Sequence, residues 1–240
     1  MASKSSSDPR GNGKGSANGQ AEREDAERGR VEPERAGRIR IGTKGRKSAA
    51  APQVDAETSL TGQVLIAMPA MGDQRFAQSV IFVCAHTREG AMGIVVNAPL
   101  ESPSFSDLLR QLKVDPVPPQ RSIRLCRGGP VENARGFVLH TADWTGDGSL
   151  RVDDGLALTA SLDILKAIAT GGGPQQGLLA LGYAGWGPGQ LDHEIQQNAW
   201  LSAPADLELI FDEDHDSKWR RALAKLKIDP LLLSDTAGHA

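Results

Sequence analysis

The sequence predicts an α+β fold, with one compact domain whose mixed β-sheet core is flanked by helices and preceded by a disordered N-terminal tail. Residues 1–59 contain no Leu, Phe, Trp, Tyr, Cys or His, so they cannot bury enough apolar surface to offset their conformational entropy. After them, strand-like apolar runs gather early and helices interleave late, without an alternating strand–helix rhythm. We therefore expect a tail over residues 1–59, dispensable for folding, and one domain over residues 60–240.

The balance of charge also differs between the N-terminal tail and the rest of the chain. The first 58 residues carry 12 Lys and Arg against 9 Asp and Glu, whereas the rest carries 15 against 21, a net charge of −6. Phosphate neutralisation supplies most non-specific affinity for nucleic acids, so we expect no direct sequence-specific DNA binding by the folded domain. Residues 35–53 hold six basic residues and no acidic one. Such a run either makes weak contact with nucleic acid or is only a solvated tail.

Targeting signals and cysteines bear on the compartment. The sequence contains neither the apolar core of a signal peptide nor an apolar run long enough to span a membrane. Cys84 and Cys126 lie in apolar, strand-like contexts typical of small buried residues, and a disulfide between them is possible but not favoured. We expect a cytoplasmic protein with no membrane contact.

Three short apolar runs begin the domain. Residues 63–68 (QVLIAM), 79–84 (SVIFVC) and 93–96 (GIVV) barely alternate, which is typical of strands buried on both faces. Gly90 lies between the second and third runs, so a hairpin is expected there.

A helix is expected next. Ser102 and Pro103 form an N-cap and first-turn pair, and the helix ends before the proline-rich loop at residues 116–119. Its apolar stripe has helical spacing and consists of Phe105, Leu108, Leu109 and Leu112.

Strands resume at residues 123–126 and 136–140, on either side of a turn at Gly128, Gly129 and Pro130. After a polar loop at residues 143–148, a second helix is expected over residues 160–169, ended by glycines.

The stretch at residues 177–200, GLLALGYAGWGPGQLDHEIQQNAW, is the strongest candidate for a functional site. Residues 178–181 predict a buried strand that ends in a glycine loop at residues 182–187. Pro188 then begins a helix that carries Gln190, Glu194 and Asn198 at i, i+4 and i+8. Such a loop either presents backbone N–H groups to a ligand or is a tight packing corner.

Helical signals close the domain. Pro204 lies where a first turn would begin, leading into residues 207–211. The last helix is expected over residues 217–227, and its buried side consists of Trp219, Ala222, Leu223 and Leu226.

Four blocks in this order, LIAMPAMGDQRFAQSVIFVC, RGGPVENARGFVLH, LGYAGWGPGQLDHEI and NAWLSAPADLELIFD, resemble the AlgH/YqgE family of bacterial proteins. The resemblance covers about residues 60–240. It implies a compact α+β cytoplasmic protein of a family often labelled as transcriptional regulators, with no settled biochemical activity. Residues 1–59 have no counterpart in the family.

Two classes of function remain. The first is a non-catalytic regulatory or binding module that contacts an unknown small molecule or protein partner. Its candidate binding residues are Asn97, Gly128, Gly129, His140, Gly182, Tyr183, Gly185, Trp186, Gln190, Glu194 and Asn198. The alternative is a hydrolase or transferase whose site gathers Asn97, His140, Tyr183 and Glu194, and convergence of these side chains in one pocket would favour it.

No cofactor or metal is expected, because the chain has no phosphate-binding loop and no ligand set with zinc spacing. Cys84 and His86 would share one face of a strand, either as a nucleophile pair or, more simply, as packing residues.

Overall fold

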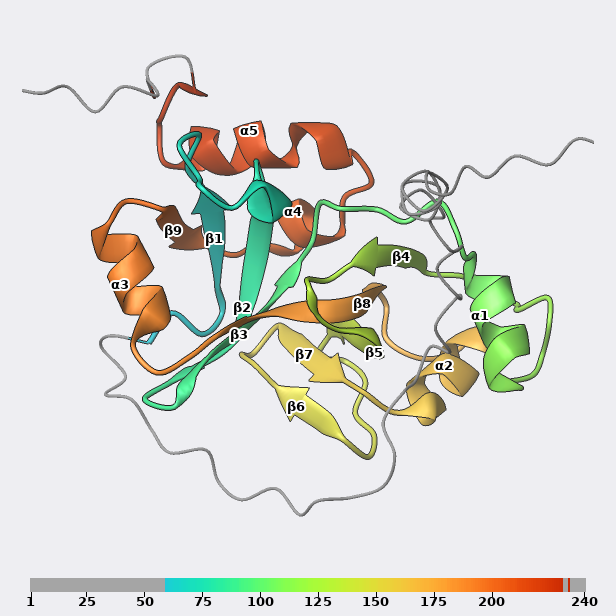
Figure 1. The fold of residues 1–240 in the computed structure, drawn as a ribbon. Helices are drawn as coiled ribbons and strands as arrows, with labels where there is room; N and C mark the ends of the chain where they lie inside the picture. Colours follow the sequence, from blue (N-terminus) through green and yellow to red (C-terminus); the bar gives the residue numbers. More distant parts are fainter. Residues whose placement is uncertain (1–58, 231–232, 234–240) are drawn as a thin grey trace, which may run out of the picture. The chain divides into compact units, whose positions relative to one another are not determined.

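The computed structural model describes residues 59–230 and 233 (Figure 1). The predicted tail therefore lies, except for Ser59, outside the described residues. The described part is an α+β domain, as the sequence predicts. No helix in it is long and apolar enough to cross a membrane.

The sheet is mixed and its strand order is β6-β7-β5-β8-β3-β2-β1-β9, with β4 pairing with β8 off this path. The strands are β1 (Gln63–Ala67), β2 (Val80–Thr87), β3 (Gly90–Val95), β4 (Arg124–Arg127), β5 (Val131–Thr141), β6 (Ser149–Arg151), β7 (Leu156–Thr159), β8 (Gly177–Trp186) and β9 (Trp200–Pro204). The helices are the 3₁₀ turn η1 (Gln74–Phe76), α1 (Phe105–Leu112), α2 (Leu162–Ala169), α3 (Gln190–Gln196), α4 (Leu207–Phe211) and α5 (His215–Lys225). The pairing of β4 with β8 is parallel, and the other pairings between the named strands are antiparallel.

The long strand β8 joins two groups of strands. Its first half pairs with β4 and β5, and its second half pairs with β3, which leads on to β2, β1 and β9. Figure 1 shows β8 passing between these groups. The prediction that the strand ends at Gly182 is wrong, because the strand continues through the glycines to Trp186.

The glycines are explained by a backbone crossing. Residues 178–181 of β8 pair with β4 and with β5, so these two strands lie on opposite edges of β8. The short turn between β4 and β5 must therefore cross β8 in direct contact. A Cβ atom on Gly128 would overlap the carbonyl oxygen of Gly182, and one on Gly129 would overlap the peptide after Tyr183. On Gly182, where φ is +73°, a Cβ would lie 2.6 Å from the Gly129 oxygen. These positions favour the packing interpretation of the glycine-rich stretch.

The starts of α1 and α4 differ from the prediction. α1 is capped by Ser104, not Ser102: the Ser104 side chain accepts a hydrogen bond from the Asp107 backbone, and the Asp107 side chain accepts from the Ser104 backbone. This reciprocal pair satisfies two backbone donors that a cap two residues earlier would leave free. α4 is capped by Asp206, because residues 200–204 form β9. Pro204 ends that strand opposite Gln63 of β1.

Three strands were not predicted: β6, β7 and β9. They are short, at three, four and five residues. β9 pairs with the distant strand β1 and β7 pairs with β5, whereas β6 pairs with the adjacent β7 at the edge of the sheet.

Helices α4 and α5 are held to one face of the sheet by polar contacts as well as by apolar packing. Trp219 donates from Nε1 to the Ala67 oxygen at 2.8 Å. The fully buried Lys218 donates to the oxygens of Ile210 at 2.8 Å and Val96 at 3.2 Å. Burial lowers the pKa of Lys218 to about 8.

Cys84 and Cys126 are both buried, and no disulfide bond joins them.

The backbone crossing can be tested with two glycines of similar conformation. Gly148 has a φ of +77° with open space around its Cα, whereas Gly182 has a φ of +73° and touches the crossing chain. Gly148→Ala should lower the free energy of unfolding by about 1 kcal/mol, the cost of a left-handed alanine. Gly182→Ala should cost about 1–3 kcal/mol more because of overpacking. Urea denaturation measures both, and equal losses would rule out a close crossing.

Candidate functional site

Helix α3 differs from the predicted helix at both ends. Pro188 does not begin it; Gly189, with a φ of +68°, occupies the N-cap. Asn198 lies beyond the C-cap with a φ of +57°. Its N–H donates to the Ile195 oxygen, and the Ala199 N–H donates to the Glu194 oxygen, both at 2.9 Å. This is a Schellman ending, in which asparagine tolerates the left-handed conformation. The predicted three-residue face is therefore wrong at Asn198.

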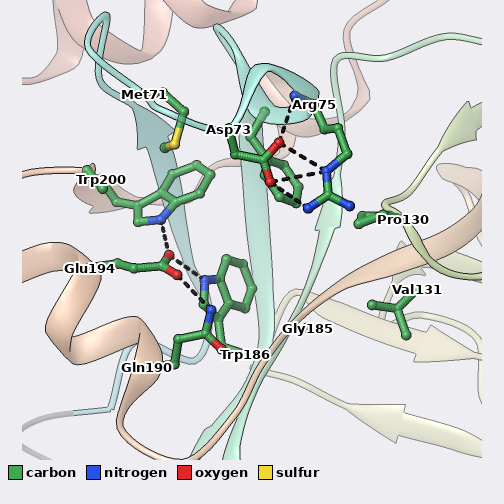
Figure 2. Close-up of a pocket in the computed structure, with 12 residues that line it drawn as sticks. Met71, Asp73, Arg75, Pro130, Val131, Gly185, Trp186, Gln190, Glu194 and Trp200 are labelled. Atoms are coloured by element: carbon green, nitrogen blue, oxygen red, sulfur yellow. Dashed lines mark hydrogen bonds and ion pairs between the residues drawn. The ribbon is translucent and has the colours of Figure 1, made fainter.

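The remaining two polar residues of that face are joined to two indoles. Glu194 Oε2 accepts hydrogen bonds from Nε1 of Trp186 and of Trp200, each at 2.8 Å. Its Oε1 accepts from Gln190 Nε2 at 2.8 Å, and Gln190 Oε1 accepts from the Gly187 N–H at 3.0 Å. Figure 2 shows both indole nitrogens pointing at the same carboxylate. This network, which we call the Trp–Glu–Trp cluster (Trp186, Glu194, Trp200), fixes α3 across the end of β8 and the start of β9.

The Trp–Glu–Trp cluster borders an open cleft of about 440 Å³. Phe76 adds a third ring, which packs edge-on against Trp200 at 5.8 Å between centroids. The crossing turn contributes Pro130 and Val131. At the rim, Arg75 Nη2 donates to Asp73 Oδ2 at 2.6 Å (Figure 2). The cleft walls thus combine apolar side chains with one carboxylate, one amide and one ion pair.

A second, more open hollow of about 490 Å³ adjoins the cleft. The two share Val131, Gly185 and Trp186. Tyr183 lines the second hollow, where its ring packs edge-on against Phe137 at 5.7 Å.

The predicted binding residues therefore separate into two groups. Those that line the cleft are Gly185, Trp186, Gln190 and Glu194. Those that do not line it are Asn97, Gly128, Gly129, His140, Gly182, Tyr183 and Asn198.

The four residues of the enzyme alternative do not meet. Asn97 holds the start of β2, since its Oδ1 accepts from the Val80 N–H at 2.8 Å and its Nδ2 donates to the Gln78 oxygen at 2.9 Å. His140 is fully buried, with Nε2 2.8 Å from Thr159 Oγ1. Tyr183 and Glu194 line different hollows. The structure therefore does not assemble the predicted hydrolase or transferase site.

Other chemical candidates are also placed in structural roles. Burial raises the pKa of the Cys84 thiol far above its usual value, which disfavours a nucleophilic thiolate. His86 Nδ1 accepts from the Leu60 N–H at 3.2 Å. Within the described residues, no three His, Cys, Asp or Glu side chains are grouped to hold a metal ion.

Sequence reasoning did not select Asp73, Arg75, Phe76 or Trp200 as site residues. A usable signal was the scarcity of aromatic residues, at 4% of the chain, of which Phe76, Trp186 and Trp200 gather here. Their convergence depends on the pairing of β1 with β9, which brings residues 67 and 200 together and which no local pattern indicates.

The cost of losing the Glu194 carboxylate is predictable. Trp186 is 7% exposed and Trp200 2%, so Glu194→Ala leaves two largely buried indole N–H groups unpaired. The free energy of unfolding should fall by about 1–3 kcal/mol. Glu194→Gln retains an oxygen acceptor and should lose less. Urea denaturation of both variants checks this, and an Ala variant as stable as the Gln variant would contradict it.

His140 should make stability depend on pH. Burial lowers its pKa below the usual value, while Thr141 and Asp143 act in the opposite direction. Below the unfolded-state pKa of about 6.5, the unfolded chain therefore binds a proton that the folded chain resists. The contribution of His140 to the free energy of unfolding is fully present above about pH 6.5 and is lost as the pH falls towards the pKa of the folded state.

The measurement is the free energy of unfolding between pH 7.5 and 5. His140→Gln should flatten its fall, whereas Gln196→Ala, a neutral change on the exposed surface of α3, should leave the slope as in the parent protein. Identical slopes in all three proteins would refute the assignment to His140.

Comparisons with known proteins agree on one family. A sequence model described as AlgH-like matches residues 64–231. A UPF0301 protein of Rhodospirillum rubrum is 55% identical over 184 residues, covering 77% of this chain and 96% of the relative. Another, of Gluconobacter oxydans, is 53% identical and covers 77% and 100%.

Two solved structures are also similar. The solution structure of the AlgH protein from Pseudomonas aeruginosa superposes with a TM-score of 0.64 at 43% identity, covering 78% of this chain and all of that one. The crystal structure of protein DIP2367 from Corynebacterium diphtheriae, at 21% identity and a TM-score of 0.55, shares the fold. The chain therefore belongs to the AlgH-like family of UPF0301 proteins.

Proposed function

We propose that this protein is a non-catalytic binding protein whose binding site is the cleft beside the Trp–Glu–Trp cluster. The observation that carries the proposal is the fixing of one partly exposed carboxylate by two indole N–H groups at the wall of an open hollow that is also lined by aromatic and aliphatic side chains. Of the residues of the enzyme alternative, Asn97 and His140 make structural hydrogen bonds away from the cleft, and Tyr183 lines the second hollow.

The dimensions and rigidity of the cleft support this function. A volume of about 440 Å³ falls within the usual range for small-molecule sites, which are mostly apolar with a few placed polar groups. The backbone crossing sets one wall and α3 sets another, so the site is preformed. A preformed site loses little conformational entropy on binding.

Further parts of the proposal rest on the family resemblance and the sequence. They are a cytoplasmic location, indirect action on transcription, and no direct DNA binding by the domain at residues 60–240. Weak nucleic-acid contact, if any, is assigned to the basic residues 35–47 of the tail.

The four tryptophans provide the test. Trp186 and Trp200 border the cleft, whereas Trp144 packs against His140 and Trp219 donates to Ala67. In ¹H–¹⁵N spectra, a library of small soluble molecules should yield binders that shift the indole signals of Trp186 and Trp200 and leave Trp144 and Trp219 in place. A library that shifts none of them, or all four equally, would reject the cleft as a binding site.

A further inference from the structure

The Glu194 carboxylate is held by neutral donors only. Its three hydrogen bonds come from two indoles and one amide. Among the residues that the structure describes, no Lys, Arg or His forms an ion pair with it. Its position is therefore fixed while its charge has no cationic partner.

Among the described residues that line the cleft, the basic side chain is already paired with another carboxylate. Arg75 is the one basic side chain among the lining residues described, and Asp73 engages it through Nε and Nη2. Glu194 Oε1 has a single donor, Gln190, whereas a carboxylate oxygen accepts two. One acceptor position on a fixed, negatively charged group thus remains for a ligand.

The surrounding rings suit a positive charge. Phe76, Trp186 and Trp200 border the same cleft, and the faces of aromatic rings attract ammonium and guanidinium groups. Met71 and Val131 add apolar surface for an aliphatic stem. The domain after residue 58 also has a net charge of −6, which favours the approach of cations.

We propose that the cleft binds an ammonium or guanidinium group carried on an apolar stem, with Glu194 as its counter-ion. This inference rests on the proposed binding function and specifies the chemistry of the ligand.

The experiment titrates the full chain with four small probes that carry different head groups on short alkyl stems: butylguanidinium, butylammonium, butyramide and butyrate. The indole signals of Trp186 and Trp200 report binding, with Trp144 and Trp219 as internal references. The two cations should bind with Kd values in the millimolar range, as expected for so few atoms, and weaken as salt is raised. Butyramide and butyrate should bind at least about tenfold more weakly, a difference of about 1.4 kcal/mol.

Variants test whether cation binding requires the charge of Glu194 and not only the shape of the cleft. Glu194→Gln should weaken binding of the cations to the level of butyramide. Glu101→Gln, at an exposed site that does not line the cleft, is the matched control and should bind as the parent does. The comparison of the two cations with butyramide in the parent protein needs no variant, so the inference remains testable if Glu194→Gln folds poorly. Cation binding that persists in Glu194→Gln would overturn the inference.

The outcomes also distinguish this inference from the proposed binding function on which it rests. If butyramide or butyrate shifts Trp186 and Trp200 as strongly as the cations do, the cleft is a binding site but not for cations. If neither these probes nor a wider library shifts the indole signals of Trp186 and Trp200, both the binding function and the cation inference are contradicted.

The same chemistry can come from a free cation or from a protein side chain. A blocked pentapeptide, Ala-Ala-Arg-Ala-Ala, separates the two sources. A protein source predicts tighter binding than butylguanidinium, with added shifts at the backbone amides of Tyr183 and Gly185, where the second hollow begins. Equal affinity without those shifts supports a small cation.

Discussion

The crossing of the β4–β5 turn over β8 is the constraint on which the rest of the domain depends. Because β4 and β5 pair with the same residues on opposite edges of β8, the connecting backbone has to pass over the strand. Gly128, Gly129 and Gly182 leave no room for side chains at that point. The crossing lets β8 continue unbroken from one group of strands into the other, and it brings Pro130 and Val131 to the cleft.

The second constraint is the attachment of α3. A seven-residue helix has little stability of its own, so its position depends on tertiary contacts. Leu191 packs into the core below it, and Glu194 receives two indole N–H groups from strands that meet only through the sheet. One carboxylate therefore stabilises the fold and also presents charge to the cleft. Any effect of a Glu194 variant on function has to be read beside its effect on stability.

Much of the fold could be predicted from local pattern. The apolar runs at residues 63–68 and 79–84 and the stripe of Phe105, Leu108 and Leu109 formed the expected elements. The errors at the ends of α1 and α3 are local, whereas those at β8 and β9 concern residues whose role depends on distant contacts. Glycines normally indicate a loop, but those of β8 accommodate a crossing chain.

The same limit applies to the site. Spacing and proximity in sequence were enough to select Trp186, Gln190 and Glu194, which line the cleft. Asn198 was selected by helical spacing, but it lies beyond the C-cap in the left-handed conformation, so that spacing does not apply to it. Arg75, Phe76 and Trp200 were missed because they reach the cleft from the η1 turn and from β9. Only the register of β9 on β1 brings them together.

The most direct test of this account is native-state hydrogen exchange as a function of urea. If the crossing makes β8 a shared strand, amides of β1 and β2 should open with the same free energy, and the same urea dependence, as amides of β5 and β7. That result means that both groups of strands unfold as one unit. Opening of β5 and β7 at a free energy lower by about 2 kcal/mol or more would contradict the account, because it would mark two units that unfold separately.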